Sequence, residues 1–234
     1  MTDEETRTNE IIEKVTLILP DAINCNRLFM RCTNLIDVDL ELPQATNCTL
    51  MFYECPTITN VRLIAPKATE YILIFADSTS LQTAVVDLPQ AIDCSYMFRG
   101  CSSLTDVDLS LPQATDCSYM FKDCSSLSSI DLEFPQATNC ESMFRDCSSL
   151  SSFDLNLPQT TNCSNMFEGC SSLTSVTLNL PQLSEYTNIF YESSNLETID
   201  VTIPEDIVNG FKSEVLTLQL ENLTSFKING EEQL

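Results

Sequence analysis

The chain contains no histidine and no tryptophan, and only 4 of its 234 residues are glycine. Without histidine it lacks the side chain that most often serves as a general acid or base and as a metal ligand. The sequence contains no P-loop, no dinucleotide-binding fingerprint and no nucleophile elbow. We therefore expect neither an enzyme nor a bound cofactor.

Positive charge and long apolar runs are also scarce. The chain has 11 Lys and Arg against 34 Asp and Glu, a formal net charge of −23. Nucleic acid is a poor partner for so acidic a chain, because phosphate binding needs a basic face. No apolar run is long enough to span a membrane, and the opening MTDEETRTNE resembles no secretory signal. We expect no membrane insertion.

What the chain has instead is a strict repeat. An apolar residue followed by Pro recurs every 23 residues, at Leu19, Leu42, Ala65, Leu88, Leu111, Phe134, Leu157, Leu180 and Ile203. A fixed period of this length is typical of a solenoid, in which each unit buries its apolar face against its neighbours. We number each repeat from the residue before Pro as position 1, and call one repeat a rung.

Positions 17, 20 and 22 are apolar in nearly every rung, as in Leu127, Ile130 and Leu132. Side chains alternate along a strand, so positions 20 and 22 face inward and position 21 faces outward. One strand per rung, always in the same direction, predicts a parallel sheet along the solenoid. The Pro at position 2 cannot donate to this sheet and marks the end of the strand.

Positions 7, 10, 11 and 14 are apolar as well, for example Cys117, Met120, Phe121 and Cys124. This spacing is one stripe of a helix, and the Asn or Asp at position 6 is a good N-cap. The fold class predicted is an α/β repeat. It is a leucine-rich-repeat solenoid of 23-residue period, with a parallel β-sheet on one face and short helices or 3₁₀ turns on the other.

The two ends of the chain depart from the repeat. Residues 1–11 are mostly polar, and we expect a frayed N-terminus there. The solenoid should run over 12–202, beginning with a strand that contains Ile12, Val15 and Leu17. The repeat loses its pattern after Ile203, and we expect 203–234 to form an atypical capping repeat that covers the end of the core.

The stretches AIDCSYMFRGCSSLTDVDL (91–109) and ATDCSYMFKDCSSLSSIDL (114–132) carry a recurring MF-x-x-C-S-S-L motif. With this motif the chain resembles the BspA-type leucine-rich repeats over roughly residues 12–230. The resemblance implies a leucine-rich-repeat solenoid, and an adhesion or binding role at a bacterial or protozoan cell surface. Because no export signal is visible, a cytoplasmic or virion-associated location also stays open.

All 12 cysteines lie at positions 7 and 14. Disulfides within a rung would be excluded if the segment were helical, because seven residues span about 10.5 Å along a helix. The short Cys spacings of zinc sites are absent, so we expect no metal there. A buried thiol ladder is the favoured interpretation, since free Cys behaves as a small hydrophobe. Rungs 3 and 8 replace Cys-Met-Cys by Tyr-Ile-Ser, which fits side chains that share one packed space.

Three sets of residues are candidates for recognition. The outward acidic column at position 21 is a candidate ligand face: Asp39, Asp108, Asp131, Asp154 and Asp200. It could bind a basic ligand or calcium, although one flat column offers few converging oxygens for Ca²⁺, and a solvated polar column is the simpler interpretation. A candidate helical-face patch combines aromatic and basic residues: Tyr96, Arg99, Tyr119, Lys122 and Arg145. A candidate apolar interface, expected to fall on two faces, comprises Leu50, Ile64, Ile72, Leu73 and Val85.

The leading functional hypothesis is a non-enzymatic binding or adhesion module that recognises a protein or glycan through one solenoid face. The alternative is a structural or assembly protein, such as a cytoplasmic scaffold or a virion component, for which homo-oligomers are possible.

Overall fold

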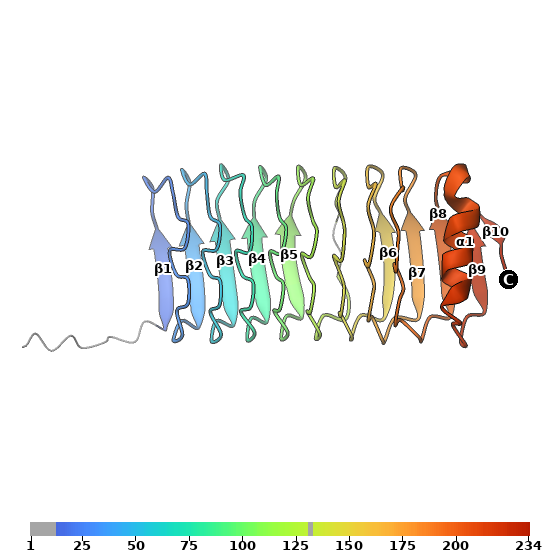
Figure 1. Ribbon diagram of the computed structural model, residues 1–234. Coiled ribbons are helices and arrows are strands. Elements are labelled where there is room, and N and C mark those ends of the chain that lie inside the picture. Colours follow the sequence, from blue (N-terminus) through green and yellow to red (C-terminus); the bar gives the residue numbers. More distant parts are fainter. Residues whose placement is uncertain (1–12, 131–132) are drawn as a thin grey trace, which may run out of the picture.

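The computed structural model describes residues 13–130 and 133–234. It shows a straight stack of rungs in which the strands lie side by side in the order of the sequence (Figure 1). The predicted solenoid is confirmed. The expected frayed segment 1–11, Ile12, Asp131 and Leu132 lie outside the described residues.

Most strands are five residues long and recur at the repeat period. The strands are β1 (Lys14–Ile18), β2 (Asp37–Glu41), β3 (Asn60–Ile64), β4 (Thr83–Asp87), β5 (Asp106–Ser110), β6 (Ser152–Asn156), β7 (Ser175–Asn179), β8 (Thr198–Thr202), β9 (Ser225–Ile228) and β10 (Glu231–Glu232). A 3₁₀ turn, η1 (Glu205–Ile207), leads into the helix α1 (Val208–Thr217). The named strands form two sheets of five, one on each side of 129–133, the stretch that contains residues 131 and 132.

The strand wall, formed by positions 19–23, is a parallel ladder. From β1 to β5 and from β6 to β8, each residue pairs with the residue 23 further on, as in Val38 with Val61 and Leu40 with Leu63. The strand β8 pairs with β9 at a spacing of 27 residues, as in Ile199 with Phe226. Positions 20 and 22 are largely buried while the residues between them face out, as the alternation predicts. Leu17 is 43% exposed, because β1 is the first described strand and has a described neighbour on one side only.

The opposite wall, formed by positions 6–14, consists of turns. No helix forms at these positions in rungs 1–8, so of the two predicted alternatives the turns are the one observed. The N–H groups of positions 10, 12 and 14 donate to the carbonyls three residues earlier, as Met120 does to Cys117. Positions 9 and 13 have positive φ in every rung of this wall, for example Leu73 at 58° and Asp77 at 61°. These left-handed residues keep the turns from continuing as a helix.

The same turns bond from rung to rung. The N–H groups of positions 7, 9, 11 and 13 donate to carbonyls at positions 6, 8, 10 and 12 of the next rung. In rung 4, for example, Cys94 donates to Asp116 O at 2.9 Å and Phe98 to Met120 O at 2.8 Å. In an α-helix these N–H groups would donate to carbonyls of the same rung. The turn wall therefore has a ladder of hydrogen bonds between rungs that a helical wall would lack.

The Asn or Asp at position 6 caps this turn wall rather than a helix. Its side-chain oxygen accepts the N–H of the residue two places on, as Asn162 does from Ser164 at 2.9 Å. This is an Asx turn, a local motif that these residues favour for the same reason that they favour N-caps. The residue type at position 6 therefore marks the start of a local structure as predicted, but that structure is a turn and not a helix.

A column of phenylalanines at position 11 fills the core along the turn wall. The rings of Phe29, Phe52, Phe75 and the five that follow at 23-residue spacing stack at 5.2–6.0 Å between centroids, within 16° of parallel. All but Phe29 are fully buried. Stacked aromatic pairs stabilise a fold beyond the area that they bury, so this column ties each rung to the next.

The last rung, 203–234, replaces the turn wall with α1 and adds the antiparallel pair β9–β10. Phe211 and Val215 of α1 are buried, and the Phe211 ring lies 5.3 Å from that of Tyr186 and 6.5 Å from that of Phe226. The Glu214 carboxylate accepts the N–H of Asn188. That N–H is the one that elsewhere donates to the next rung, so α1 closes the inter-rung ladder at this point.

Candidate functional site

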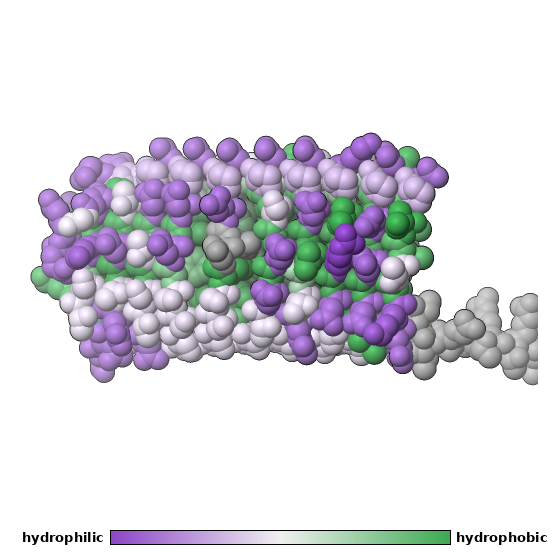
Figure 2. Space-filling view, turned by 180° about the vertical axis from the view of Figure 1, so that it is seen from behind, coloured by the Kyte–Doolittle hydropathy of each residue, from purple (hydrophilic) through white to green (hydrophobic). Residues whose placement is uncertain are grey.

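The outer surface consists of columns in which equivalent side chains follow one another at the rung spacing, about 4.8 Å on the sheet. Figure 2 shows such rows of like residues running along the length of the molecule. The core positions repeat with little change, whereas the outward positions differ from rung to rung. Any recognition surface therefore consists of outer-column residues.

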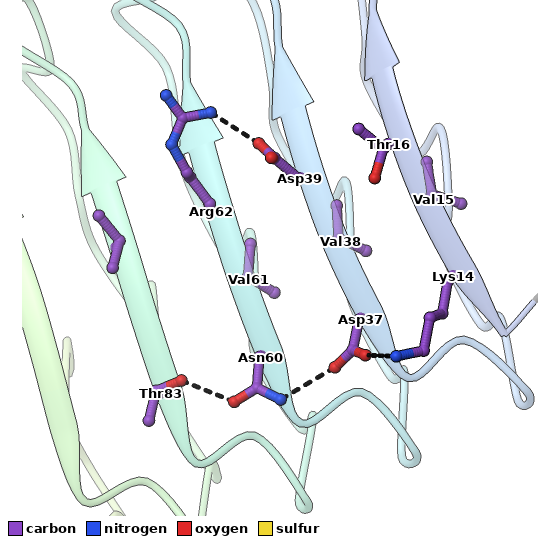
Figure 3. Close-up of a pocket in the computed structure, with 11 residues that line it drawn as sticks. Lys14, Val15, Thr16, Asp37, Val38, Asp39, Asn60, Val61, Arg62 and Thr83 are labelled. Atoms are coloured by element: carbon purple, nitrogen blue, oxygen red, sulfur yellow. Dashed lines mark hydrogen bonds and ion pairs between the residues drawn. The ribbon is translucent and has the colours of Figure 1, made fainter.

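One hollow on the strand wall lies across β1–β4. It has a volume of about 410 Å³. The trough, as we call it, lies between the position-19 side chains Lys14, Asp37, Asn60 and Thr83 and the position-21 side chains of the same strands (Figure 3).

Cross-strand contacts fix both rims of the trough. On one rim, Lys14 Nζ lies 2.6 Å from Asp37 Oδ2, Asn60 Nδ2 donates to Asp37 Oδ1 at 2.9 Å, and Thr83 Oγ1 donates to Asn60 Oδ1 at 2.8 Å (Figure 3). On the other, Arg62 Nη1 lies 2.6 Å from Asp39 Oδ1 and 3.0 Å from Glu41 Oε1. The hydrogen bonds from Lys14 and Asn60 lower the pKa of Asp37.

The acidic column at position 21 divides into two kinds of site. Asp39 is half-buried and paired with Arg62, whereas Asp108, Asp154 and Asp200 are exposed. Asp131 lies outside the described residues. The column therefore has a charge-paired N-terminal part and a solvated part nearer the C-terminus.

The predicted helical-face patch lies on the turn wall. The Tyr96 and Tyr119 rings stack at 4.6 Å and 2° from parallel, and the Arg99 guanidinium lies 6.0 Å from the Tyr96 centroid. Tyr119 Oη donates to Glu141 Oε1 at 2.6 Å. The basic members pair with acids: Arg99 with Asp77 at 2.5 Å, Lys122 with Asp123 at 3.9 Å, and Arg145 with Glu168 at 2.9 Å. The acidic partners Asp77 and Glu168 lie in neighbouring rungs and were not among the residues considered with the patch.

The candidate apolar interface is divided between two walls. Leu50, Ile72 and Leu73 lie half-buried on the turn wall, and Ile64 and Val85 lie in β3 and β4. Val85 is 47% exposed and lines the trough. The Leu50–Leu73 pair precedes Tyr96 and Tyr119 in the same column, position 9, a continuity that grouping the residues by polarity does not reveal.

The cysteines are all free thiols, and eleven of the twelve are buried. Since the turn wall is not helical, the spacing argument against disulfides does not hold, yet the favoured thiol ladder is confirmed. Burial raises the pKa of Cys48 to about 12 and that of Cys55 to about 11. Buried neutral thiols of this kind are unreactive.

Position 14 has a hydrogen-bonding role that explains its replacements. Cys124 Sγ donates to Phe98 O at 3.2 Å. The same hydrogen bond, from position 14 of one rung to position 11 of the preceding rung, recurs at Cys101, Cys147 and Cys170. In rung 3, Ser78 Oγ donates to Phe52 O at 2.8 Å in its place. In rung 8, Ser193 does the same to Phe167. Serine substitutes for cysteine because both can donate to this carbonyl.

Position 7 accepts a buried tyrosine in place of cysteine in rung 3. Tyr71 is fully buried at a position where six other rungs have Cys, and its hydroxyl donates to Ala65 O at 2.7 Å, within its own rung. The larger side chain is tolerated because its polar end finds this partner.

Within 13–130 and 133–234, no cluster of three or more His, Cys, Asp or Glu side chains is placed to hold a metal ion. No helix in the same residues is both long and apolar enough to cross a membrane.

Comparison with known protein families gives a match over residues 90–219 to the BspA-type leucine-rich repeat region, in six copies. The chain belongs to the BspA-type leucine-rich repeat family. This repeat family is typical of protein-interaction scaffolds without catalytic activity.

Two solved structures are similar to this BspA-type chain. One is a leucine-rich repeat protein from Bacteroides ovatus, with 20% identity and a TM-score of 0.40, covering 91% of this chain and 42% of that protein. The other is a leucine-rich repeat protein from T. pallidum, with 20% identity and a TM-score of 0.38, covering 88% of this chain and 84% of that protein. No match was found among curated proteins.

Proposed function

We propose that the chain is a non-enzymatic binding module that recognises a protein or glycan ligand through its strand wall, with adhesion at a cell surface as the setting. Membership of the BspA-type family supports a role in interaction. The extended, regular surface of a solenoid also supports it, because such surfaces present many outward side chains on a rigid frame.

The observation that carries the proposal is the trough across β1–β4. The buried residues Val15, Val38 and Val61 line it between the rims. The rims hold donors and acceptors in fixed positions: the Lys14 ammonium, the Arg62 guanidinium, and the Asn60 and Thr83 side chains. Ion pairs and hydrogen bonds restrain these groups before a ligand arrives, which reduces the entropy lost on binding. The strands β6–β8 carry mainly Ser, Thr and Asn outward and have no comparable set of charges.

The test is a pull-down and a glycan array with the intact chain and two variants. Arg62→Gln removes the cation that joins Asp39 and Glu41, and Asn179→Ala is the matched control. Asn179 is an outward residue of β7, hydrogen-bonded to the equivalent Asn156 at 2.8 Å. We expect a bound ligand to be lost or weakened at least tenfold by Arg62→Gln and retained by Asn179→Ala.

A third variant separates the trough from the acidic column. It changes Asp108, Asp131 and Asp154 together to Asn. Binding that survives this change but fails with Arg62→Gln places the ligand at the trough. Full binding by the Arg62→Gln variant would refute the trough as the site.

A further inference from the structure

The cysteine columns at positions 7 and 14 are interrupted at the same two rungs. Rung 3 has Tyr71 and Ser78 in place of the two cysteines, and rung 8 has Tyr186 and Ser193. Each column is therefore divided into a run of two cysteines, in rungs 1 and 2, and a run of four, in rungs 4–7. Both runs are even, so every cysteine can be paired with one in an adjacent rung and none is left over.

Adjacent rungs lie close enough for disulfides at both positions. Cys94 N donates to Asp116 O at 2.9 Å at position 7, and Gly100 N donates to Lys122 O at 2.8 Å beside position 14. Chain segments joined by such a ladder lie about 4.8 Å apart. The Cα atoms of bridged cysteines are usually about 4.4–6.8 Å apart, so the rung spacing falls within the required range.

The sulfur atoms of position 14 also turn toward the neighbouring rung. Cys124 Sγ donates to Phe98 O at 3.2 Å, and Phe98 belongs to the rung that contains Cys101. Burial, followed by the thiols of Cys147 and Cys101 in the rungs on either side, raises the pKa of Cys124. The thiols of one column are therefore electrostatic neighbours from rung to rung.

From these observations we propose that the two columns form six disulfides between adjacent rungs when the chain folds in the presence of an oxidant. Complete pairing of neighbours within these runs has one solution: Cys25–Cys48, Cys32–Cys55, Cys94–Cys117, Cys101–Cys124, Cys140–Cys163 and Cys147–Cys170. The ladder of free thiols described above is then the reduced form of the same core. The proposal does not depend on the trough, since the thiols lie on the turn wall and the trough lies on the strand wall.

The oxidant is a small disulfide such as glutathione disulfide. One protein thiolate attacks it, so that a mixed disulfide forms and one glutathione leaves as its thiolate. The thiolate of the adjacent rung then attacks the protein sulfur of that mixed disulfide and releases the second glutathione. For each bridge, two protein thiols lose two electrons and two protons, and glutathione disulfide takes them up as two thiols.

Burial decides when the bridges form. In the folded, reduced chain eleven of the twelve thiols are buried, and the exception is Cys32 in rung 1. A water-soluble oxidant therefore reaches most of the thiols only while the chain is folding. The bridges would be strained, because in-register side chains keep their Cβ atoms near the rung spacing rather than at the about 3.8 Å of a relaxed disulfide. Strain raises the reduction potential of a disulfide, so a dithiol reductant should return the chain to its free-thiol form.

The first test folds the chain with the oxidant present. The unaltered chain is reduced, unfolded in urea and refolded with glutathione disulfide, and its thiols are then counted with a colorimetric reagent after denaturation. We expect the count to fall from 12 to none and to return to 12 with dithiothreitol. Mass spectrometry of unreduced peptides should find the six bridges, each joining residues 23 apart. Thiols retained in the folded chain, or any other connectivity, would overturn the proposal.

Two double variants with equal numbers of cysteines test the pairing itself. Cys101→Ser with Cys124→Ser removes both members of one predicted bridge, and no thiol should stay free. Cys124→Ser with Cys147→Ser removes one member from each of two bridges, so Cys101 and Cys170, three rungs apart, should stay free. Serine suits position 14, since rungs 3 and 8 use it for the same hydrogen bond. Equal counts of free thiols in the two variants would refute pairing between adjacent rungs.

The second test uses the folded, reduced chain and needs no refolding. Cys32 is the thiol that glutathione disulfide reaches first, and Cys55 is its neighbour in the next rung. We expect the first bridge to join these two residues, so that the thiol count falls by two from 12 before any other pair reacts. A lasting mixed disulfide at Cys32, with Cys55 still a thiol, would show that neighbouring sulfur atoms cannot meet and would overturn the proposal.

Discussion

The strand wall and the turn wall keep the same rung spacing by different means. The strand wall uses extended residues whose side chains alternate, so it needs only apolar residues at positions 20 and 22. The turn wall needs left-handed residues at two positions, a stacked phenylalanine and a donor side chain at position 14. The strand wall therefore accepts many residue types at most positions, whereas the turn wall requires particular ones. The turn wall should therefore be where the molecule is most easily broken.

The largest effect is expected from alkaline pH, because all 12 thiols lie on the turn wall. Burial raises the pKa of Cys48, Cys140 and Cys170 to about 12, above an ordinary value of about 8.5. A raised folded-state pKa gives stability that is full below the ordinary pKa and is lost as pH rises through the folded value. Thermal unfolding followed by circular dichroism should show a constant midpoint up to about pH 8 and a steep fall between about pH 9 and 12.

The rise of thiolate absorbance in the ultraviolet should coincide with that unfolding transition. Thiolate that appears at ordinary pKa while the chain stays folded would mean that the cysteine columns are accessible to water.

The next largest effect should come from the phenylalanine column. Phe121→Ala removes a fully buried ring that stacks on two neighbours at 5.5 Å, and it should cost about 3–5 kcal/mol in the free energy of unfolding. Phe29→Ala is the matched change at the first rung, where the ring is half-buried and stacks on one described neighbour. Urea unfolding should give a clearly smaller loss for Phe29→Ala, and equal losses would argue against the column as a continuous support.

Position 14 offers a finer test of the turn wall. Ser78 Oγ accepts the N–H of Cys55 at 3.3 Å and donates to Phe52 O, so Ser78→Ala leaves both buried backbone groups without this partner. We expect a loss of about 1–3 kcal/mol. Ser78→Cys restores the residue that most rungs use and should stay within about 0.5 kcal/mol of the unaltered chain. Chemical denaturation of the two variants side by side would decide whether the position-14 side chain stabilises the fold by its hydrogen bonds or only by filling space. Equal stability of the two variants would argue against the hydrogen-bonding role.

The smallest effect is expected on the strand wall. Arg62 is 42% exposed in its side chain, and exposed ion pairs contribute only about 0–1 kcal/mol. Arg62→Gln should therefore change the free energy of unfolding by less than about 1 kcal/mol, even though it should abolish ligand binding at the trough. A large loss of stability from this variant would show that the Arg62 ion pairs support the fold. The strand wall would then be as sensitive to substitution as the turn wall.

The two walls also differed in how well the sequence predicted them. The strand wall follows from alternation at positions 20 and 22, and its register follows from the unbroken period. For the turn wall the prediction left two alternatives, short helices or 3₁₀ turns, because apolar residues at i, i+3, i+4 and i+7 suit both. Glycine, the usual signal of a left-handed residue, appears at only two such positions, Gly100 and Gly169. At other left-handed positions the chain has bulky residues such as Leu73 and Tyr96, from which a positive φ is not expected.

For the candidate sites, the members of each column could be read from the repeat, but their partners could not. The 23-residue period places Asp39 beside Arg62 and Tyr96 beside Tyr119. The period does not determine which way a long side chain turns, so the chain of contacts Lys14–Asp37–Asn60–Thr83 is seen only in the structure. The helix α1 was not predicted either, because 203–234 was expected to form an atypical capping repeat and no helix was specified within it.

The inter-rung bonds that positions 7, 9, 11 and 13 of the turn wall donate all point one way. In each of rungs 1–7, the N–H groups of positions 7, 9, 11 and 13 face the C-terminal neighbour, and their acceptor carbonyls face back toward the N-terminus. Aligned peptide groups add their dipoles, as they do along a helix. This wall is therefore an array of parallel dipoles whose positive pole lies beside rung 8, where the anionic Glu214 meets Asn188. A negative group at that pole is favoured by the field of the whole stack.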